Sequence, residues 1–156
     1  MEKVVKFIKN IFYKLYRNEY VRVFAIVFFL GFVFFGTKAL GNGLTMGFNG
    51  DYTLQTLALY SDGYTKIWEF IRTGEFPMFD FSNSFGNDYI GSASFYYLTS
   101  PLYYLLLLCP KDYLFQGIYI LLLIKYAIGG TLFYVLLKKF FGYKDRTCLV
   151  GAIVYA

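Results

Sequence analysis

The stretch LFQGIYILLLIKYAIGGTLFYVLL, residues 114–137, decides the fold class of this chain. It is almost entirely apolar, with Gln116 and Lys125 as the main exceptions. It is also longer than the about 20 apolar residues that a transmembrane α-helix needs. Four cations follow it: Lys138, Lys139, Lys144 and Arg146. Because such cations favour the cytoplasmic side, the stretch predicts a helix that runs inward from the exterior, followed by a cytoplasmic loop over residues 138–146.

A second apolar run, residues 23–40, comes earlier in the chain. Its polar residues are Thr37 and Lys38, and it is just long enough to span a bilayer if Lys38 extends its amine toward water. Residues 1–22 combine lysines and arginines with apolar residues at helical spacing, which predicts a basic amphipathic helix on the cytoplasmic leaflet. A signal peptide is the alternative interpretation of this segment. With a cytoplasmic amino terminus, residues 23–40 run outward.

The composition also indicates a membrane protein. Hydrophobic residues make up 58% of the chain and aromatic residues 24%, whereas soluble domains are roughly 45 to 50% apolar. The net charge is +5, but the cations flank the apolar runs and therefore indicate membrane orientation, not nucleic-acid binding. The chain has no histidine, which excludes nucleophiles activated by histidine. Cys109 and Cys148 lie at opposite ends of the inward helix, so we expect no disulfide between them.

Residues 41–113 connect the two spans, and we expect them outside the cell. The polar part of this loop is acidic, because its carboxylates outnumber its cations, Lys66 and Arg72. Residues 52–73 have apolar positions at helical spacing, which predicts an interfacial helix with a break at Asp62-Gly63.

A third apolar run, about residues 96–109, contains Ser100-Pro101 and stops at Pro110. If it crossed the membrane, the cations after the inward helix would lie outside, against the positive-inside rule. We therefore predict a juxtamembrane or re-entrant helix that begins near the proline. Residues 147–156 start a further apolar run of about half a span, so we expect the chain to be truncated. The predicted fold is an all-α integral membrane protein with a large extracytoplasmic first loop.

Asp51 follows the first span closely, so we expect its carboxylate at the outer membrane surface. There it could remove a proton from a hydroxyl group or bind a divalent cation. Asp51 could also be an N-cap for the helix that begins at Tyr52, a role that aspartate often has, that the spacing favours and that is compatible with the chemical one. Glu75, Asp80 and Asp88 are each either a second acid of the site or a solvated turn residue.

Lys125 lies near the middle of the predicted inward helix, where a charge costs about 2.5 to 3.5 kcal/mol on insertion scales. We expect it to face protein or a water-filled cavity, as a partner for an acidic group or a lipid phosphate. The aromatic residues of the loop suit either stacking on sugars or a belt at headgroup level, and the belt accounts for more of them.

The order of these features resembles one family. A basic amino terminus and one span are followed by four motifs: GDYTLQ (50–55), WEFIRTGEFPMFDFSNSFGND (68–88), SFYYLTSPLYYLLLLCP (94–110) and IKYAIGG (124–130). Together, over about residues 20–145, they resemble the YfhO family of bacterial membrane proteins. The resemblance implies a GT-C type glycosyltransferase, a multi-pass enzyme of the bacterial plasma membrane that takes a sugar from a polyprenyl-phosphate donor. The acceptor that it implies is an envelope polymer of the teichoic-acid type.

The resemblance also implies site residues. Asp51 matches by position the acid that serves such enzymes as catalytic base or metal ligand. Candidate substrate-binding residues are Gln55, Trp68, Asp88, Tyr96, Tyr97 and Lys125. Family members carry further spans, so we expect this stretch by itself to be inactive. The alternative functions are a transporter or flippase-like protein, which needs polar residues on several spans, and an accessory subunit of a larger membrane enzyme.

Overall fold

The computed structural model describes residues 17–41, 43, 50–76, 78–80 and 86–156. Apart from turns, these residues are helical, with one short antiparallel pair of strands, β1 (Phe79–Asp80) and β2 (Asn87–Asp88). The chain divides into two compact units. The first unit comprises Met1–Gly36 and Leu123–Ala156, and the second comprises Thr37–Leu122.

The described part of the chain has two helices with the length and composition to cross a membrane. Their apolar segments are Glu19–Thr37 and Lys111–Lys139, with mean hydropathies of 2.0 and 2.1. Most of these segments belong to α2 (Glu19–Gly41) and α5 (Leu114–Lys139). Both helices lie where the sequence predicts its two spans.

The helix α2 begins earlier than predicted, at Glu19. The side chain of Asn18 explains this start, because its Oδ1 accepts a hydrogen bond from the backbone N–H of Tyr20 at 3.0 Å. Asparagine at this position caps a helix N-terminus. Residues 19–22 therefore belong to the apolar helix and not to a separate basic helix over residues 1–22. Residues 1–16 of that predicted helix lie outside the described part of the chain.

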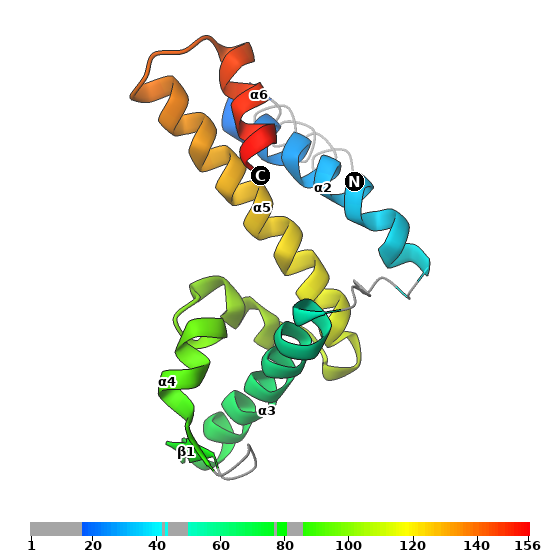
Figure 1. Cartoon of the computed structure of the whole chain (residues 1–156), viewed down its shortest axis with the longest axis vertical. Helices are drawn as coiled ribbons and strands as arrows, with labels where there is room; N and C mark the ends of the chain where they lie inside the picture. The colour runs from blue at the N-terminus through cyan, green and yellow to red at the C-terminus, as the bar shows by residue number, and fades with distance from the viewer. Residues whose placement is uncertain (1–16, 42, 44–49, 77, 81–85) are drawn as a thin grey trace, which may run out of the picture. The chain divides into compact units, whose positions relative to one another are not determined.

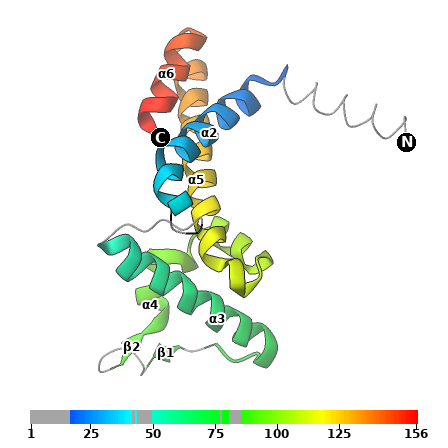
Figure 2. The same cartoon turned by 90° about the vertical axis from the view of Figure 1, so that its right-hand side faces the viewer.

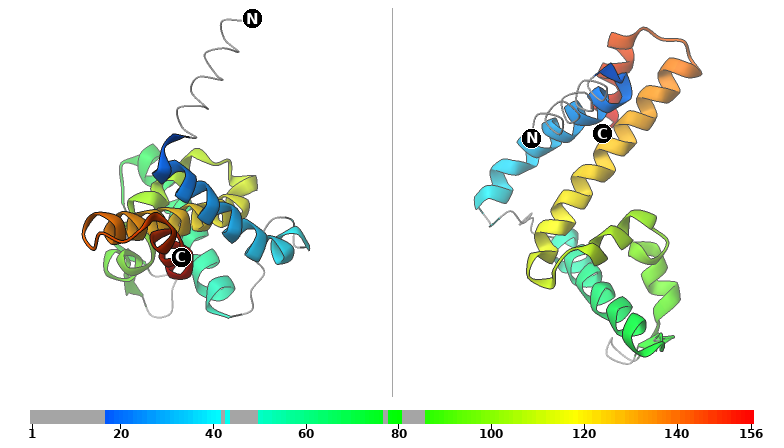
Figure 3. Two further views of the ribbon diagram at one scale, coloured as in Figure 1. Left: turned by 90° about the horizontal axis from the view of Figure 1, so that it is seen from above. Right: turned by 180° about the vertical axis from the view of Figure 1, so that it is seen from behind.

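In the first unit, α2 and α5 pack together with α6 (Asp145–Tyr155), as Figures 1 and 3 show. Their shared core consists of Val23, Val27, Tyr134, Cys148 and Ala152. Gly130 of α5 allows the close approach, because a Cβ there would lie 3.0 Å from the carbonyl oxygen of Ala152 and 3.1 Å from a methyl group of Val27. Small residues at such contacts are typical of helix packing in membranes.

An ion cluster connects the start of α2, the end of α5 and the start of α6. The Lys138 amine contacts the carboxylates of Glu19 and Asp145, the latter at 3.0 Å. The Tyr134 hydroxyl donates to the same Glu19 oxygen at 3.3 Å. The sequence indicated Lys138 only as an orientation signal in a loop. Instead α5 continues through this lysine, and its ion pairs hold the three helices together.

In the second unit, a π-helical turn, η1 (Tyr52–Leu57), continues directly into α3 (Ala58–Thr73), in agreement with the predicted helix. The helix ends at Gly74, whose φ of 76° lies in the left-handed region that glycine favours. The predicted break at Asp62-Gly63 is wrong, because α3 continues through both residues. Gly63 instead leaves room for a ring, since a Cβ there would lie 2.3 Å from Cζ of Tyr97.

The remaining segments of the second unit are short. In chain order they are β1, β2, α4 (Tyr89–Ala93), the π-turn η2 (Ser94–Leu98), and the 3-10 segments η3 (Pro101–Leu108) and η4 (Lys111–Tyr113). β1 and β2 pair with Phe79 opposite Asp88. The run predicted as one helix over residues 96–109 is therefore divided at Ser100-Pro101. Its second part begins at the proline as predicted but has 3-10 geometry.

The core of the second unit is rich in tyrosine. Tyr97 and Tyr103 are 1% and 0% exposed, and their ring centroids lie 4.6 Å apart. Tyr60 packs edge-on against both rings, at 6.0 and 5.0 Å. Apolar side chains from the first turns of α5 complete this core: Leu114, Ile118 and Leu121. Figure 2 shows α3 and α4, which carry several of the tyrosines of this unit.

Candidate functional site

Asp51 directly precedes η1 and is exposed. The backbone at Asp51 is already helical, with φ −57° and ψ −32°, and its side chain forms no cap hydrogen bond. The favoured interpretation of Asp51 as an N-cap is therefore wrong, because a capping side chain needs an extended backbone to reach back to the first N–H groups. Its Oδ1 instead accepts a hydrogen bond from Nε2 of Gln55 at 3.4 Å, one helical turn later.

Gln55 links Asp51 to a distant segment. The hydroxyl of Tyr96 in η2 donates to Oε1 of Gln55 at 3.1 Å. Because this bond occupies the amide oxygen, it directs the amide N–H₂ toward the carboxylate. The ring of Tyr96 is itself packed edge-on against Phe95, with centroids 5.2 Å apart. The structure thus brings together three residues that the sequence named as separate candidates.

This arrangement suits a proton acceptor. The Asp51 carboxylate is open to solvent, and its one described side-chain contact comes from a neutral amide, so the carboxylate keeps lone pairs for a hydroxyl group. Among the described residues, no group of three histidine, cysteine or acidic side chains lies close enough together to hold a metal ion. The described side chains therefore do not supply a ligand set around Asp51.

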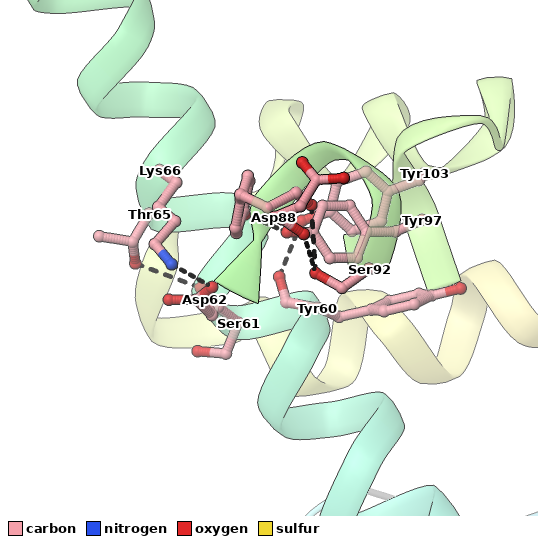
Figure 4. Close-up of polar contacts among 10 residues, drawn as sticks. Tyr60, Ser61, Asp62, Thr65, Lys66, Asp88, Ser92, Tyr97 and Tyr103 are labelled. Atoms are coloured by element: carbon pink, nitrogen blue, oxygen red, sulfur yellow. Dashed lines mark hydrogen bonds and ion pairs between the residues drawn. The ribbon is translucent and has the colours of Figure 1, made fainter. Parts of the chain in front are cut away.

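Buried tyrosines from α3, α4, η2 and η3 pack together in the core of this unit, and Figure 4 shows Tyr60, Tyr97 and Tyr103. The hydroxyl groups of Tyr89 and Tyr97 share a hydrogen bond, and the Tyr103 hydroxyl donates to the carbonyl oxygen of Tyr60 at 2.8 Å. Burial raises the pKa of Tyr89, and its hydrogen bond with Tyr97 raises it further. Burial also raises the pKa of Tyr103. These phenols therefore stay neutral and serve as packing and hydrogen-bonding groups.

The same network changes the interpretation of Tyr97, which the sequence named as a substrate-binding candidate. Its ring is buried against Gly63 and Tyr60, and its hydroxyl is used by Tyr89. A side chain so enclosed has no surface for a ligand. Tyr97 thus belongs to the core, whereas its neighbour Tyr96 carries the contact to Gln55.

An ion pair on α3 borders these phenols (Figure 4). The Lys66 amine lies 2.9 Å from the Asp62 carboxylate and 4.3 Å from the centroid of the Tyr89 ring. Residues four apart face each other on a helix, so the sequence spacing could have indicated the Asp62 and Lys66 pair. The contact with Tyr89 comes only from the fold, because it connects α3 with α4.

Asp88 and Lys125 have separate surroundings. Asp88 caps α4, because its Oδ2 accepts a hydrogen bond from the backbone N–H of Gly91 at 3.0 Å, although it remains exposed. Lys125 lies on α5 within the first unit and is partly buried. Glu75 is exposed just after α3, and the side chain of Asp80 lies outside the described part of the chain.

Trp68 lines a cavity of about 420 Å³ on one side of α3. The other lining residues are Tyr64, Thr65, Glu69, Arg72 and Lys111. The sequence named Trp68 but missed the rest of this cavity. Arg72 follows Trp68 by four residues, which helical spacing could have indicated. Lys111 could not be found in this way, because it joins the cavity from η4.

Comparisons with known proteins identify the family. A sequence model described as bacterial membrane protein YfhO matches residues 22–156. No curated protein and no solved structure matches the chain. The family match includes all of α5 and the whole second unit, with Asp51, Gln55 and Tyr96 inside it. Because this match covers most of the sequence, the chain belongs to the YfhO family of bacterial membrane proteins.

Proposed function

We propose that this chain carries the catalytic base of a GT-C type membrane glycosyltransferase, and that Asp51 is this base. The observation that carries the proposal is the arrangement of Asp51, Gln55 and Tyr96. The exposed carboxylate of Asp51 is oriented by the amide of Gln55, and this amide is held by the phenol of Tyr96 from another segment. Membership of a membrane protein family and two apolar helices support the membrane location that this proposal requires.

The proposed reaction moves a sugar from a polyprenyl-phosphate donor to a hydroxyl group of an envelope polymer of the teichoic-acid type. The acceptor oxygen forms a bond to the anomeric carbon of the sugar, and the Asp51 carboxylate takes the proton from that oxygen. The bond between the anomeric carbon and the phosphate oxygen breaks, and polyprenyl phosphate leaves with the electron pair. A positioned carboxylate contributes to such a step by general base catalysis. Gln55 is a positioning residue in this proposal.

The proposed setting is the bacterial plasma membrane, which the chain crosses more than once. In this setting α2 runs outward from a cytoplasmic amino terminus and α5 runs back inward. The cations near the end of α5 support this orientation, since they favour the cytoplasm. Asp51 follows α2 and would then lie outside the cell, where a lipid-borne donor and an envelope polymer can meet. Lys125 remains a candidate for a lipid phosphate contact.

The test replaces Asp51 in the protein as the cell makes it. Asp51→Asn keeps the size and the hydrogen bond from Gln55 but removes the base, so sugar transfer in isolated membranes should fall about 10² to 10⁴-fold. Asp112→Asn is the matched control, because Asp112 is an exposed aspartate of the same unit that lies on η4. Transfer by Asp51→Asn at the rate of the control, with equal amounts of protein in the membrane, would refute the proposal.

A second variant tests the positioning role of Gln55. Gln55→Leu removes the amide while leaving the carboxylate, so we expect a lower kcat with a nearly unchanged KM for the donor. If Gln55 served only to hold η1 in place, Gln55→Leu would reduce the amount of folded protein and leave kcat per folded molecule unchanged.

A further inference from the structure

The cavity beside Trp68 has more hydrogen-bond donors than acceptors. Arg72 and Lys111 are exposed and form no ion pair or hydrogen bond with another described side chain. The Trp68 Nε1–H is shielded from solvent, and it too finds no acceptor among the described residues. Glu69 is the one acid among the described lining residues. The described lining therefore has two cations against one anion, which suits a ligand with negatively charged oxygen atoms.

The hydroxyl groups of the lining already form hydrogen bonds within the protein. The Tyr64 hydroxyl donates to the carbonyl oxygen of Cys109 at 2.9 Å, which connects α3 to the end of η3. The Thr65 hydroxyl donates to the carbonyl oxygen of Ser61 at 3.2 Å. Their donors are therefore not available to a ligand. The rings of Tyr64 and Trp68, with centroids 6.5 Å apart, provide an apolar wall beside the cations.

The position of Lys111 places this cavity at the edge of a membrane. Lys111 is the first residue of the apolar segment Lys111–Lys139, and it belongs to the same compact unit as α3. The end of a membrane span lies at the level of the lipid headgroups, where tryptophan, tyrosine and basic residues are enriched. Both ends of a span lie at headgroup level, so the cavity has this position whichever side of the membrane the unit faces.

We propose that this cavity binds the phosphodiester headgroup of an anionic membrane lipid. Arg72 and Lys111 hold the phosphate oxygens, and Trp68 lies against the glycerol region. The net positive lining selects a headgroup of net negative charge over a zwitterionic one. This site is separate from the proposed transfer reaction, because it uses neither Asp51 nor Gln55.

The chain provides its own reporter for this site. Trp68 is the only tryptophan in the sequence, so intrinsic tryptophan fluorescence monitors the cavity without engineering. The experiment places the protein in phosphatidylcholine vesicles and adds phosphatidylglycerol that carries a quencher next to the headgroup. We expect quenching that saturates at low mole fractions of phosphatidylglycerol. The same quencher on phosphatidylcholine should give only the weak quenching expected from random mixing.

Variants identify the residues responsible. Arg72→Gln and Lys111→Gln should each weaken the apparent affinity for phosphatidylglycerol about fivefold, because a basic residue near an anionic surface is worth about that factor. Glu69→Gln should strengthen it, because it removes the one opposing charge. Lys144→Gln changes the net charge equally but lies in the first unit and outside the cavity, so it should leave binding unchanged. Circular dichroism and the emission spectrum in pure phosphatidylcholine show whether each variant is folded.

A competition experiment distinguishes two possible sources of the bound phosphate group, the bulk lipid and the polyprenyl-phosphate donor. Unlabelled polyprenyl phosphate or unlabelled phosphatidylglycerol is added to compete with the quencher lipid. Competition by phosphatidylglycerol at matched mole fraction assigns the site to the bulk lipid, whereas competition by polyprenyl phosphate alone overturns that assignment. Equal quenching by both headgroups, or an affinity that Arg72→Gln and Lys111→Gln leave unchanged, overturns the site itself. Loss of transfer in Asp51→Asn with normal lipid binding would show that the two proposals are independent.

Discussion

Replacing Gly63 with alanine would test whether Tyr97 is locked in the core of the second unit. The new Cβ would lie 2.3 Å from Cζ, 2.4 Å from Cε2 and 2.7 Å from the hydroxyl oxygen of Tyr97. The ring has little room to move, because it is 1% exposed and packs against Tyr60 and Tyr103. Its hydroxyl is also bonded to Tyr89.

The expected magnitude follows from two opposing effects. Overpacking a filled core costs about 1 to 3 kcal/mol, and a Cβ that would lie 2.3 Å from a ring atom belongs in the upper half of that range. Alanine is better than glycine in a helix by about 1 kcal/mol. Gly63→Ala should therefore destabilise the protein by about 1 to 2 kcal/mol. For a chain of this size, that loss corresponds to a melting temperature lower by about 2 to 8 °C. Thermal unfolding of the detergent-purified protein, followed by circular dichroism, provides the measurement.

A second glycine in a helix provides the control for Gly63→Ala. Gly129→Ala makes the same change inside α5, where the new Cβ would meet only Cε1 of Tyr155 at an ordinary 3.6 Å, so it should be neutral or stabilising. In a Tyr97→Leu background the clash partner is gone, and Gly63→Ala should then cost much less than in the natural protein. If Gly63→Ala has the same effect in both backgrounds, the ring of Tyr97 does not occupy the space next to Gly63.

Two further predictions concern charge. Burial raises the pKa of Tyr52 to about 12, and the pKa of Tyr89 and Tyr103 is raised for the same reason; in the unfolded chain tyrosine titrates near 10. Because the folded state binds these protons more tightly, their contribution to stability is complete below about pH 10 and is lost as the pH rises toward 12. In an alkaline titration, the loss of helix content by circular dichroism should therefore coincide with the rise in tyrosinate absorbance. If all the tyrosines ionise near pH 10 while the helices stay intact, the prediction is wrong. Glu19→Gln should lower the melting temperature more than Asp145→Asn, since Glu19 is 29% exposed and also accepts a hydrogen bond from Tyr134, whereas Asp145 is 70% exposed. Equal effects would mean that the more buried pair with Glu19 stabilises the protein no more than the exposed pair with Asp145.

The agreement between sequence and structure is best where the determining forces are local. The helix over residues 52–73 was predicted from apolar spacing, and the proline start of η3 was predicted from the preference of proline for a first helical turn. The predicted break at Asp62-Gly63 is wrong because the role of Gly63 depends on a distant residue. A glycine in a helix often indicates an interruption, but here Gly63 makes space for a ring that comes from residue 97.

In the candidate site, too, local contacts could be predicted from the sequence and contacts between distant segments could not. Asp51 and Gln55 are one turn apart and come from a single motif, so both could be named from the sequence. The contact of Gln55 with Tyr96 joins residues 41 positions apart, and no local pattern separates Tyr96 from the adjacent Tyr97. Both are tyrosines in a run of aromatic residues, yet one contacts Gln55 and the other is enclosed in the core. Their different roles result from which side of η2 packs against α3.

The sequence by itself determined the family, the apolar helices and the acidic residue after the first of them. These depend on composition and spacing within single segments, because the length of an apolar run sets whether it can cross a bilayer. Only the tertiary structure decided which side chains meet: the phenol that holds Gln55, the ring that fills the space beside Gly63, and the lysine of η4 that completes the cavity of α3. The physical reason is that burial and hydrogen bonding between distant segments depend on the packing of whole helices, which no single segment specifies.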